Sequence, residues 1–239
     1  MHKNAIHKNG TYGGKKLLKA IVFDFDGVLF NSREVQRKAL YESYRLVNKD
    51  GEPSFEEFLS HSGDSIFNIL KKMNLPLEMA DYYLDMIKEN ADNVKVYKGI
   101  NNLLQKLHEE GFKLAICTGR DKKSTIQLIE MNGIHDYFNV VVCADDVMYP
   151  KPNPQILLQA IDLLGIEKKY CVMVGDSCND LICAKNAGVK SIAVEWGDTK
   201  KEVLKLQEPD IFVESPEELY ECIRKENILL KDNLNISMC

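Results

Sequence analysis

Six short apolar runs, separated by segments of helical periodicity, constrain the fold of this chain more than any other feature of its sequence. The runs are Lys19–Phe23, Lys113–Cys117, Val140–Cys143, Cys171–Val174, Ser191–Val194 and Ile211–Val213. Each is continuously apolar, which is typical of strands buried on both faces of a parallel sheet. The segments with helical spacing are Ile100–Glu110, Lys122–Asn132, Pro154–Leu164, Asp180–Ala187, Lys200–Leu206 and Pro216–Lys225. This alternation predicts a layered α/β fold with right-handed crossovers.

One interval breaks the alternation. Between about Arg33 and Val96 only helical patterns occur, at Glu34–Val47, Phe55–Leu59, Ser65–Met73 and Leu77–Asn90. A block of this length is more than a crossover, so we expect a small helical domain inserted after the first strand, with hinges near Phe30–Arg33 and Asn93–Gly99. Ligands of open α/β sheets bind at the carboxyl ends of the strands. The inserted domain would therefore cover the ligand crevice as a lid.

These patterns predict a division of the chain into four parts. Residues 17–31 and 97–226 would form the α/β core, and residues 32–96 the helical domain. Residues 1–16 are polar and basic and are expected to form a mobile tail. Residues 227–239 form a C-terminal tail, for which a docking segment and a frayed end both remain open.

Composition excludes several classes of partner. Lys and Arg total 31 against 36 Asp and Glu, a net charge of −5, which disfavours nucleic acid and anionic membranes because both require clustered positive charge. No apolar run approaches the roughly 18 residues of a membrane helix. The seven cysteines include no CxxC pair and are typical of the reduced thiols of a cytoplasmic protein. Monomer and homodimer both remain open.

Chemically active side chains follow four successive predicted strands at their carboxyl ends. They are Asp24 and Asp26 after the first strand, Thr118, Gly119 and Arg120 after the second, Lys151 in the loop after the third, and Asp176 with Asp180 after the fourth. Each group alone is weak evidence for a functional site, since acids and glycines are common in turns. Together they would meet at one edge of one sheet, which chance placement does not readily explain.

Such a crevice suits phosphoryl transfer. Asp24, Asp26 and Asp176 cannot all stay ionised close together without a cation, and hard oxygen ligands suit Mg²⁺. Lys151 and Thr118 could hold the oxygens of a phosphoryl group. A carboxylate aligned with phosphorus could then attack it and form an aspartyl-phosphate. A second carboxyl two residues on lies on the same side of an extended strand, where it could exchange protons with the leaving group and with water.

The four motifs resemble those of a known family. AIVFDFDGVLFNS, CTGR, KPNP and VGDSCND, in this order, are similar to the four motifs of the haloacid dehalogenase superfamily, the phosphatases that use an aspartate nucleophile. The resemblance covers about residues 19–225. It implies a Rossmann-like parallel sheet core with an inserted all-helical cap of the type-one class. Phosphoglycolate-phosphatase-like and β-phosphoglucomutase-like members are the most similar.

The resemblance also implies roles for the motif residues. Asp24 would be the nucleophile and Asp26 the general acid/base, while Thr118 would bind the phosphoryl oxygens and Lys151 would neutralise them. Mg²⁺ would be bound by Asp24, the backbone carbonyl of Asp26 and Asp176, with Asp180 in the outer shell.

The roles of several other residues stay open. Gly119 and Arg120 could contact the substrate phosphate, or Arg120 could lie on the surface. His61 and Asp64 belong to the segment HSGDS, which could reach the substrate as a specificity loop or could simply start a helix with Asp64 or Ser65 as its N-cap. Asp198 follows the fifth strand, where a helix cap and a substrate contact are alternatives.

The function expected is Mg²⁺-dependent hydrolysis of a small phosphorylated metabolite, either a sugar phosphate or an organic-acid phosphate such as phosphoglycolate. A phosphomutase of the β-phosphoglucomutase type shares all four motifs and is the first alternative. A metal-independent dehalogenase would leave Asp26, Asp176 and Asp180 unexplained. A non-catalytic regulator on the same fold would be expected to lack the nucleophile or the lysine, and both Asp24 and Lys151 are present.

Overall fold

The central sheet holds the strands that the apolar runs predict. The computed structural model describes residues 18–48 and 50–235, with side chains to residue 225, so the predicted N-terminal tail lies outside the described residues. The sheet is parallel and has the strand order β5-β4-β1-β6-β7-β8. Its strands are β1 (Ala20–Phe23), β4 (Lys113–Cys117), β5 (Val140–Val142), β6 (Cys171–Gly175), β7 (Lys190–Val194) and β8 (Ile211–Val213). The predicted α/β fold class is confirmed.

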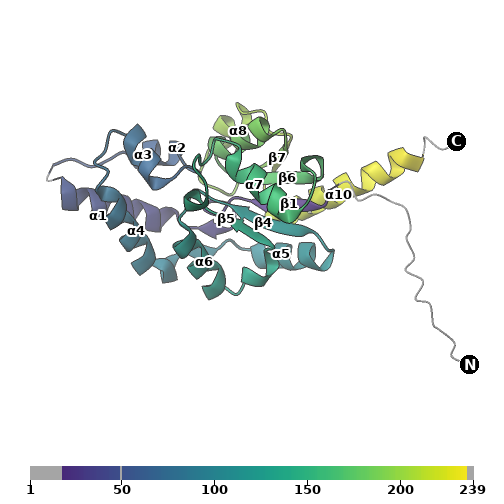
Figure 1. Cartoon of the computed structure of the whole chain (residues 1–239), viewed down its shortest axis with the longest axis horizontal. Helices are drawn as coiled ribbons and strands as arrows, with labels where there is room; N and C mark the ends of the chain where they lie inside the picture. Colours follow the sequence, from purple (N-terminus) through teal and green to yellow (C-terminus); the bar gives the residue numbers. More distant parts are fainter. Residues whose placement is uncertain (1–17, 49, 236–239) are drawn as a thin grey trace, which may run out of the picture.

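Helices cover both faces of this sheet (Figure 1). Successive side chains of a strand point to opposite faces, and β1 accordingly sends Ile21 and Phe23 into one core and Ala20 and Val22 into the other. The first face is covered by α5 (Ile100–Glu109), α6 (Lys122–Met131) and α10 (Pro216–Asn235). The second is covered by α7 (Gln155–Leu164), α8 (Cys178–Ala187) and α9 (Lys201–Lys205).

Short elements complete the core. Single 3-10 turns lie at Ala91–Asn93, His135–Tyr137, Ala144–Asp146 and Lys168–Tyr170. Helix α10 continues to Asn235, past its predicted end at Lys225, so most of the predicted C-terminal tail is helical. Within the described residues, no helix combines the length and the apolar character needed to cross a lipid bilayer.

Four helices form the interval that breaks the strand–helix alternation. They are α1 (Arg33–Val47), α2 (Phe55–Ser60), α3 (Ile66–Lys72) and α4 (Met79–Glu89), here called the helical insert. The insert begins after β2 (Phe30–Asn31) and ends before β3 (Lys95–Val96), two strands that pair antiparallel. Neither strand was predicted, because a two-residue strand is too short to show a period. The two predicted hinges are therefore hydrogen-bonded to each other.

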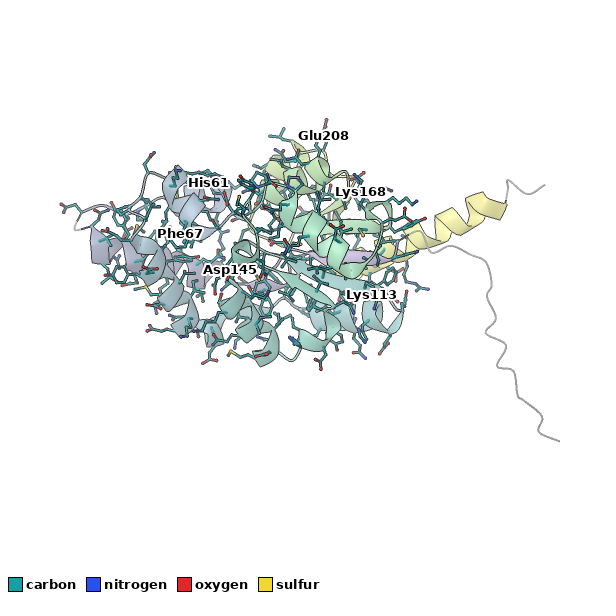
Figure 2. The ribbon with its side chains drawn as sticks, viewed as in Figure 1. His61, Phe67, Lys113, Asp145, Lys168 and Glu208 are labelled. Carbon is teal, nitrogen blue, oxygen red and sulfur yellow. The ribbon has the colours of Figure 1, made fainter. Side chains whose placement is uncertain are left out.

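The insert lies at the carboxyl end of the sheet. Asp145, which follows β5, lies near the insert, whereas Lys113, at which β4 begins, lies on the side of the core away from the insert (Figure 2). Buried insert residues such as Leu40 and Leu70 belong to the same apolar cluster as Ile21 and Phe23 of β1. Insert and core thus meet where the predicted catalytic residues are.

Candidate active site

A cavity of about 310 Å³ lies between the helical insert and the carboxyl ends of the strands. Asp24, Asp26 and the segment Thr118–Arg120 line it from the core, and the segment Ser62–Asn68 lines it from the insert. The structure therefore brings the ends of β1 and β4 together beneath the insert. This is the arrangement expected from the carboxyl ends of neighbouring parallel strands.

Lys151 joins two of the predicted carboxylates. Its Nζ donates to Oδ1 of Asp24 at 2.6 Å, to Oδ1 of Asp180 at 2.5 Å and to the carbonyl oxygen of Cys117 at 3.1 Å. The lysine side chain is completely buried, as is that of Asp180. The other oxygen of Asp180 accepts from the backbone N–H and the hydroxyl of Ser177 at the start of α8. Asp180 therefore fixes Lys151 against Asp24.

Asp176 directly follows β6, next to this group. Its Oδ2 accepts a hydrogen bond from the backbone N–H of Asp198 at 2.8 Å, and its Oδ1 is buried without a protein partner. A Cβ on Gly197 would lie 2.3 Å from the Cβ of Asp176, so the loop after β7 can approach only because residue 197 is a glycine. The unpartnered Oδ1 is the kind of buried polar atom that points to a missing ligand.

The acidic cluster fits a divalent cation. Asp24, Asp176 and Asp180 each offer an oxygen, and these atoms lie within 4.8 Å of one another. Burial, reinforced by the charge of Asp180 and opposed by Lys151, raises the pKa of Asp24 to about 7. Burial, followed by the charges of Asp24 and Asp180, raises the pKa of Asp176 well above its usual range. One lysine cannot compensate three buried carboxylates, so a hard cation suits this donor set.

Asp26 is held by Arg120. The guanidinium donates from Nε to Oδ2 at 3.1 Å and from Nη2 to Oδ1 at 2.7 Å, a bidentate pair. It also lies over the ring of Phe25, with 5.5 Å to the ring centre. The third nitrogen, Nη1, is buried without a partner. Arg120 was expected to contact the substrate or the solvent, and in the structure it orients the predicted general acid/base instead.

Thr118 and Gly119 form the floor of the cavity beside Asp24. Thr118 is buried, and its Oγ1 accepts from the backbone N–H of Arg120 at 3.1 Å. A Cβ on Gly119 would lie only 2.3 Å from the carbonyl oxygen of Asp64 in the insert. Glycine at position 119 thus lets the insert backbone approach the core closely.

The carboxylate of Asp64 forms its hydrogen bonds and its ion pair within the insert. Oδ1 accepts from the backbone N–H of Ser65 at 2.7 Å and from Nδ2 of Asn68 at 2.8 Å, and Oδ2 pairs with Nζ of Lys72 at 2.8 Å. Ser65 is the N-cap of α3, as one of the two interpretations of this segment predicted. Asp64 lines the cavity, but both oxygens of its carboxylate already have partners within the insert.

His61 does not line the cavity; its backbone carbonyl holds the insert to the core. Nδ2 of Asn179 donates to the carbonyl oxygens of His61 at 3.1 Å and Ser62 at 2.8 Å. Asn179 lies on the first turn of α8, so its side chain ties the insert to the segment that also carries Asp180. The sequence analysis missed this role, because a strand-end motif does not reveal what faces it from another domain.

The contacts of Asp198 with Asp176 and Arg33 were not predicted, for the same reason. Helix α9 begins at Lys201 with Lys200 as its N-cap, so the expected capping role of Asp198 is wrong. Its backbone holds Asp176, as described above, and its carboxylate accepts from Nη1 of Arg33 at 3.0 Å. Arg33 is the first residue of the insert, so this contact connects the hinge to the acidic cluster. The only sequence signal was the glycine at position 197.

Comparison with known proteins agrees with this geometry. The family model of the haloacid dehalogenase-like hydrolases matches residues 21–194. Pyrophosphatase PpaX of Halalkalibacterium halodurans is 28% identical over 208 residues, 86% of this chain and 97% of the relative. Pyrophosphatase PpaX of Bacillus pumilus is 29% identical over 205 residues, 84% of this chain and 94% of the relative.

Solved structures show the same fold. A protein described as a predicted phosphatase from Clostridium acetobutylicum has a TM-score of 0.78 and 27% identity, covering 87% of this chain and 99% of that one. CbbY from Rhodobacter sphaeroides, solved in complex with phosphate, has a TM-score of 0.72 and 22% identity, covering 84% and 96%. The resemblance inferred from the four motifs is thereby confirmed, and with it the expectation of an enzyme. The chain belongs to the haloacid dehalogenase-like hydrolases.

Proposed function

We propose that this hydrolase is a Mg²⁺-dependent phosphomonoesterase that acts through an aspartyl-phosphate on Asp24. The observation that carries the proposal is the contact between Asp24 and Lys151, buried at one end of a cavity that also exposes Asp26. A nucleophilic carboxylate, a cation for the phosphoryl oxygens and a second carboxyl for proton transfer are the groups that the reaction requires. The names of the relatives support a phosphoanhydride or phosphate ester as substrate class.

The cation would be bound by Asp24, Asp176 and the backbone carbonyl of Asp26. The unpartnered oxygen of Asp176 supports this assignment, and the contacts of Asp180 with Lys151 and Ser177 support its place outside the inner ligand set. When bound, Mg²⁺ supplies positive charge that neutralises the phosphoryl oxygens and the carboxylates around them.

In the first half-reaction, a carboxylate oxygen of Asp24 attacks phosphorus and the ester P–O bond breaks. Lys151 donates to Asp24 and, with Thr118, stabilises the charge on the phosphoryl group. Asp26, in its acid form, gives its proton to the oxygen of the leaving alcohol. The helical insert lies over the cavity during this step and excludes bulk water.

In the second half-reaction, Asp26 takes a proton from a water molecule that attacks phosphorus. The bond between phosphorus and Asp24 breaks, which releases inorganic phosphate and restores the carboxylate. Arg120 keeps both oxygens of Asp26 in a fixed orientation, so the proton acceptor stays directed at the site. We therefore assign Arg120 a positioning role.

Phosphate release from a panel of phosphorylated compounds, with Mg²⁺ and with EDTA, tests the proposal. Asp24→Asn is expected to abolish release, and Asp136→Asn, whose carboxyl is fully exposed, serves as the matched control. We expect EDTA to abolish the activity of the wild type. We expect Asp24→Asn to be inactive and Asp136→Asn to be active, with circular dichroism showing that both variants are folded. Turnover near the wild-type rate in Asp24→Asn would refute the nucleophile assignment.

The same panel distinguishes a phosphomonoesterase from a pyrophosphatase and from a phosphomutase. Pyrophosphate belongs in it because relatives that are 28% and 29% identical carry the name pyrophosphatase. A hexose phosphate reports the phosphomutase alternative, since a mutase would form an isomer and release little phosphate.

A further inference from the structure

Most of the cavity wall away from Asp24 and Asp26 is apolar. The insert contributes six apolar side chains, from α2, α3 and α4, and the core adds four from the loop after β5. These side chains are Phe58, Ile66, Phe67, Ile69, Leu84 and Ile87 from the insert and Ala144, Val147, Met148 and Pro150 from the core. A leaving group attached to a phosphoryl group at Asp24 would extend between these walls. Phe67 marks the insert side and Asp145 the core side in Figure 2.

Among the described residues that line the cavity, the one cationic side chain is already paired with a carboxylate. Among the cavity-lining residues that the structure describes, Arg120 is the only one with a cationic side chain, and five lining residues are aspartates. Two guanidinium nitrogens of Arg120 are committed to Asp26, and the third is buried from solvent. The nearby Lys72 and Lys122 pair with Asp64 and Asp146 and do not line the cavity.

The other polar side chains of the cavity walls are neutral, among them Ser62, Ser65 and Asn68. Gln36 and Tyr83 line the cavity from the insert. Burial raises the pKa of the Tyr83 phenol above its ordinary value, so this side chain carries no charge at physiological pH. Neutral donors and acceptors can accept an uncharged group but do not compensate an anion.

From this arrangement we infer that the enzyme prefers a small phosphate monoester whose leaving alcohol is uncharged and largely apolar. The inference rests on the proposed phosphomonoesterase function and narrows its substrate class. A carboxylate or second phosphate on the leaving group would be moved from water into apolar walls without a partner, which is strongly unfavourable. Organic-acid phosphates such as phosphoglycolate, and pyrophosphate, are therefore the poorer substrates.

Size limits the leaving group as well. The cavity of about 310 Å³ is at the lower end of the range of ligand sites. An apolar cavity of about 150 Å³ takes a molecule of the size of benzene, so the volume is sufficient for a phosphoryl group with an alcohol of about that size. Pentyl phosphate fits this description.

A matched pair of esters tests the charge preference. Pentyl phosphate and 5-(phosphonooxy)pentanoate share the reacting bond and the chain length and differ at the far end by a carboxylate. We expect kcat/KM for pentyl phosphate to be higher by about tenfold or more, because the cavity leaves the carboxylate unpaired. Phosphoglycolate, pyrophosphate and glucose 6-phosphate complete the set, and each is expected to be slower than pentyl phosphate.

A positive charge placed in the cavity should reduce the preference for the uncharged leaving group. Phe67 is 50% exposed and lines the cavity, so Phe67→Lys adds a cation there with little cost to folding. We expect this variant to narrow the ratio between the two pentyl esters by about tenfold. Leu77→Lys is the control, because Leu77 is 51% exposed and does not line the cavity. The control should keep the wild-type ratio.

The outcomes separate this inference from the proposed function. Suppose that 5-(phosphonooxy)pentanoate, phosphoglycolate, pyrophosphate or glucose 6-phosphate is hydrolysed faster than pentyl phosphate, and that Asp24→Asn is still inactive. This result would overturn the inference but not the proposed phosphomonoesterase function. An equal change of ratio in Phe67→Lys and Leu77→Lys would also overturn it. If no compound of the set releases phosphate, the proposed function is overturned, and the inference with it.

Discussion

Replacement of Asp24, the proposed nucleophile, should stabilise the metal-free protein. Asp24→Asn abolishes a charge that is buried beside Asp176 and Asp180, with Lys151 as the only nearby cation that contacts it among the described residues. Burial and the charge of Asp180 raise the pKa of Asp24 from 3.8 to about 7. Each step of one in pKa corresponds to about 1.4 kcal/mol, so ionised Asp24 costs the folded state on the order of 4 kcal/mol.

The sign of the pH dependence follows from the raised pKa. The contribution of this group to stability is fully present below the unfolded pKa of Asp24, and it is lost as pH rises through the folded value of about 7. The carboxamide of the Asp24→Asn variant does not titrate. Between about pH 4 and pH 8, the free energy of unfolding of this variant should therefore gain about 2–4 kcal/mol relative to the wild type.

Urea unfolding in EDTA across this pH range measures the difference in unfolding free energy between the wild type and Asp24→Asn. Asp136→Asn removes an exposed carboxyl and should show no such pH-dependent gap. Addition of Mg²⁺ at the upper end of the range should stabilise the wild type more than the variant, because binding to the folded state adds to its stability. A gap between wild type and Asp24→Asn that stays constant with pH would refute the electrostatic reasoning.

The remaining predictions concern residues that hold the site together. Lys151→Met leaves its buried carboxylate partners without their cation and should lower the unfolding free energy in EDTA by about 3–5 kcal/mol; an unchanged urea midpoint would contradict this. Arg120→Gln should lower kcat more than it changes KM, and Arg120→Lys should not restore kcat, because an ammonium cannot form the bidentate pair. Asn179→Ala removes two hydrogen bonds to the insert and should lower kcat/KM by about tenfold with near-normal stability. Gly119→Ala places a Cβ 2.3 Å from an insert carbonyl oxygen and should reduce activity in steady-state assays while circular dichroism stays unchanged; full activity would show that the insert yields readily.

The sheet could be predicted from sequence because burial on both faces leaves a continuous apolar signal. Lys113–Cys117 and Ile211–Val213 match β4 and β8 residue for residue. Strands β2 and β3 could not be predicted in this way, because two residues form a strand there only through pairing with each other across the length of the insert. The longer extent of α10, which continues to Asn235, was also missed.

The motif residues of the site could be predicted because each follows a strand, and parallel strands bring their carboxyl ends together. Thr118, Lys151 and Asp176 are buried at that edge as the topology requires. The contacts between insert and core could not be predicted. Whether Arg120 meets substrate, solvent or Asp26 depends on the packing of Phe25 and Tyr83 around it, and a single sequence carries no signal of that packing.

The pairing of β2 with β3 has a consequence for how this molecule can change over evolutionary time. Phe30 lies opposite Val96, so the chain leaves the core and returns to it at points about 5 Å apart. A tight turn spans that separation as well as four helices do, and the entropy of closing a loop grows only slowly with its length. The chain connection alone therefore sets no length or architecture for the inserted segment. The predicted catalytic carboxylates are positioned by β1 and β6, and the inserted segment adds its own contacts to the core.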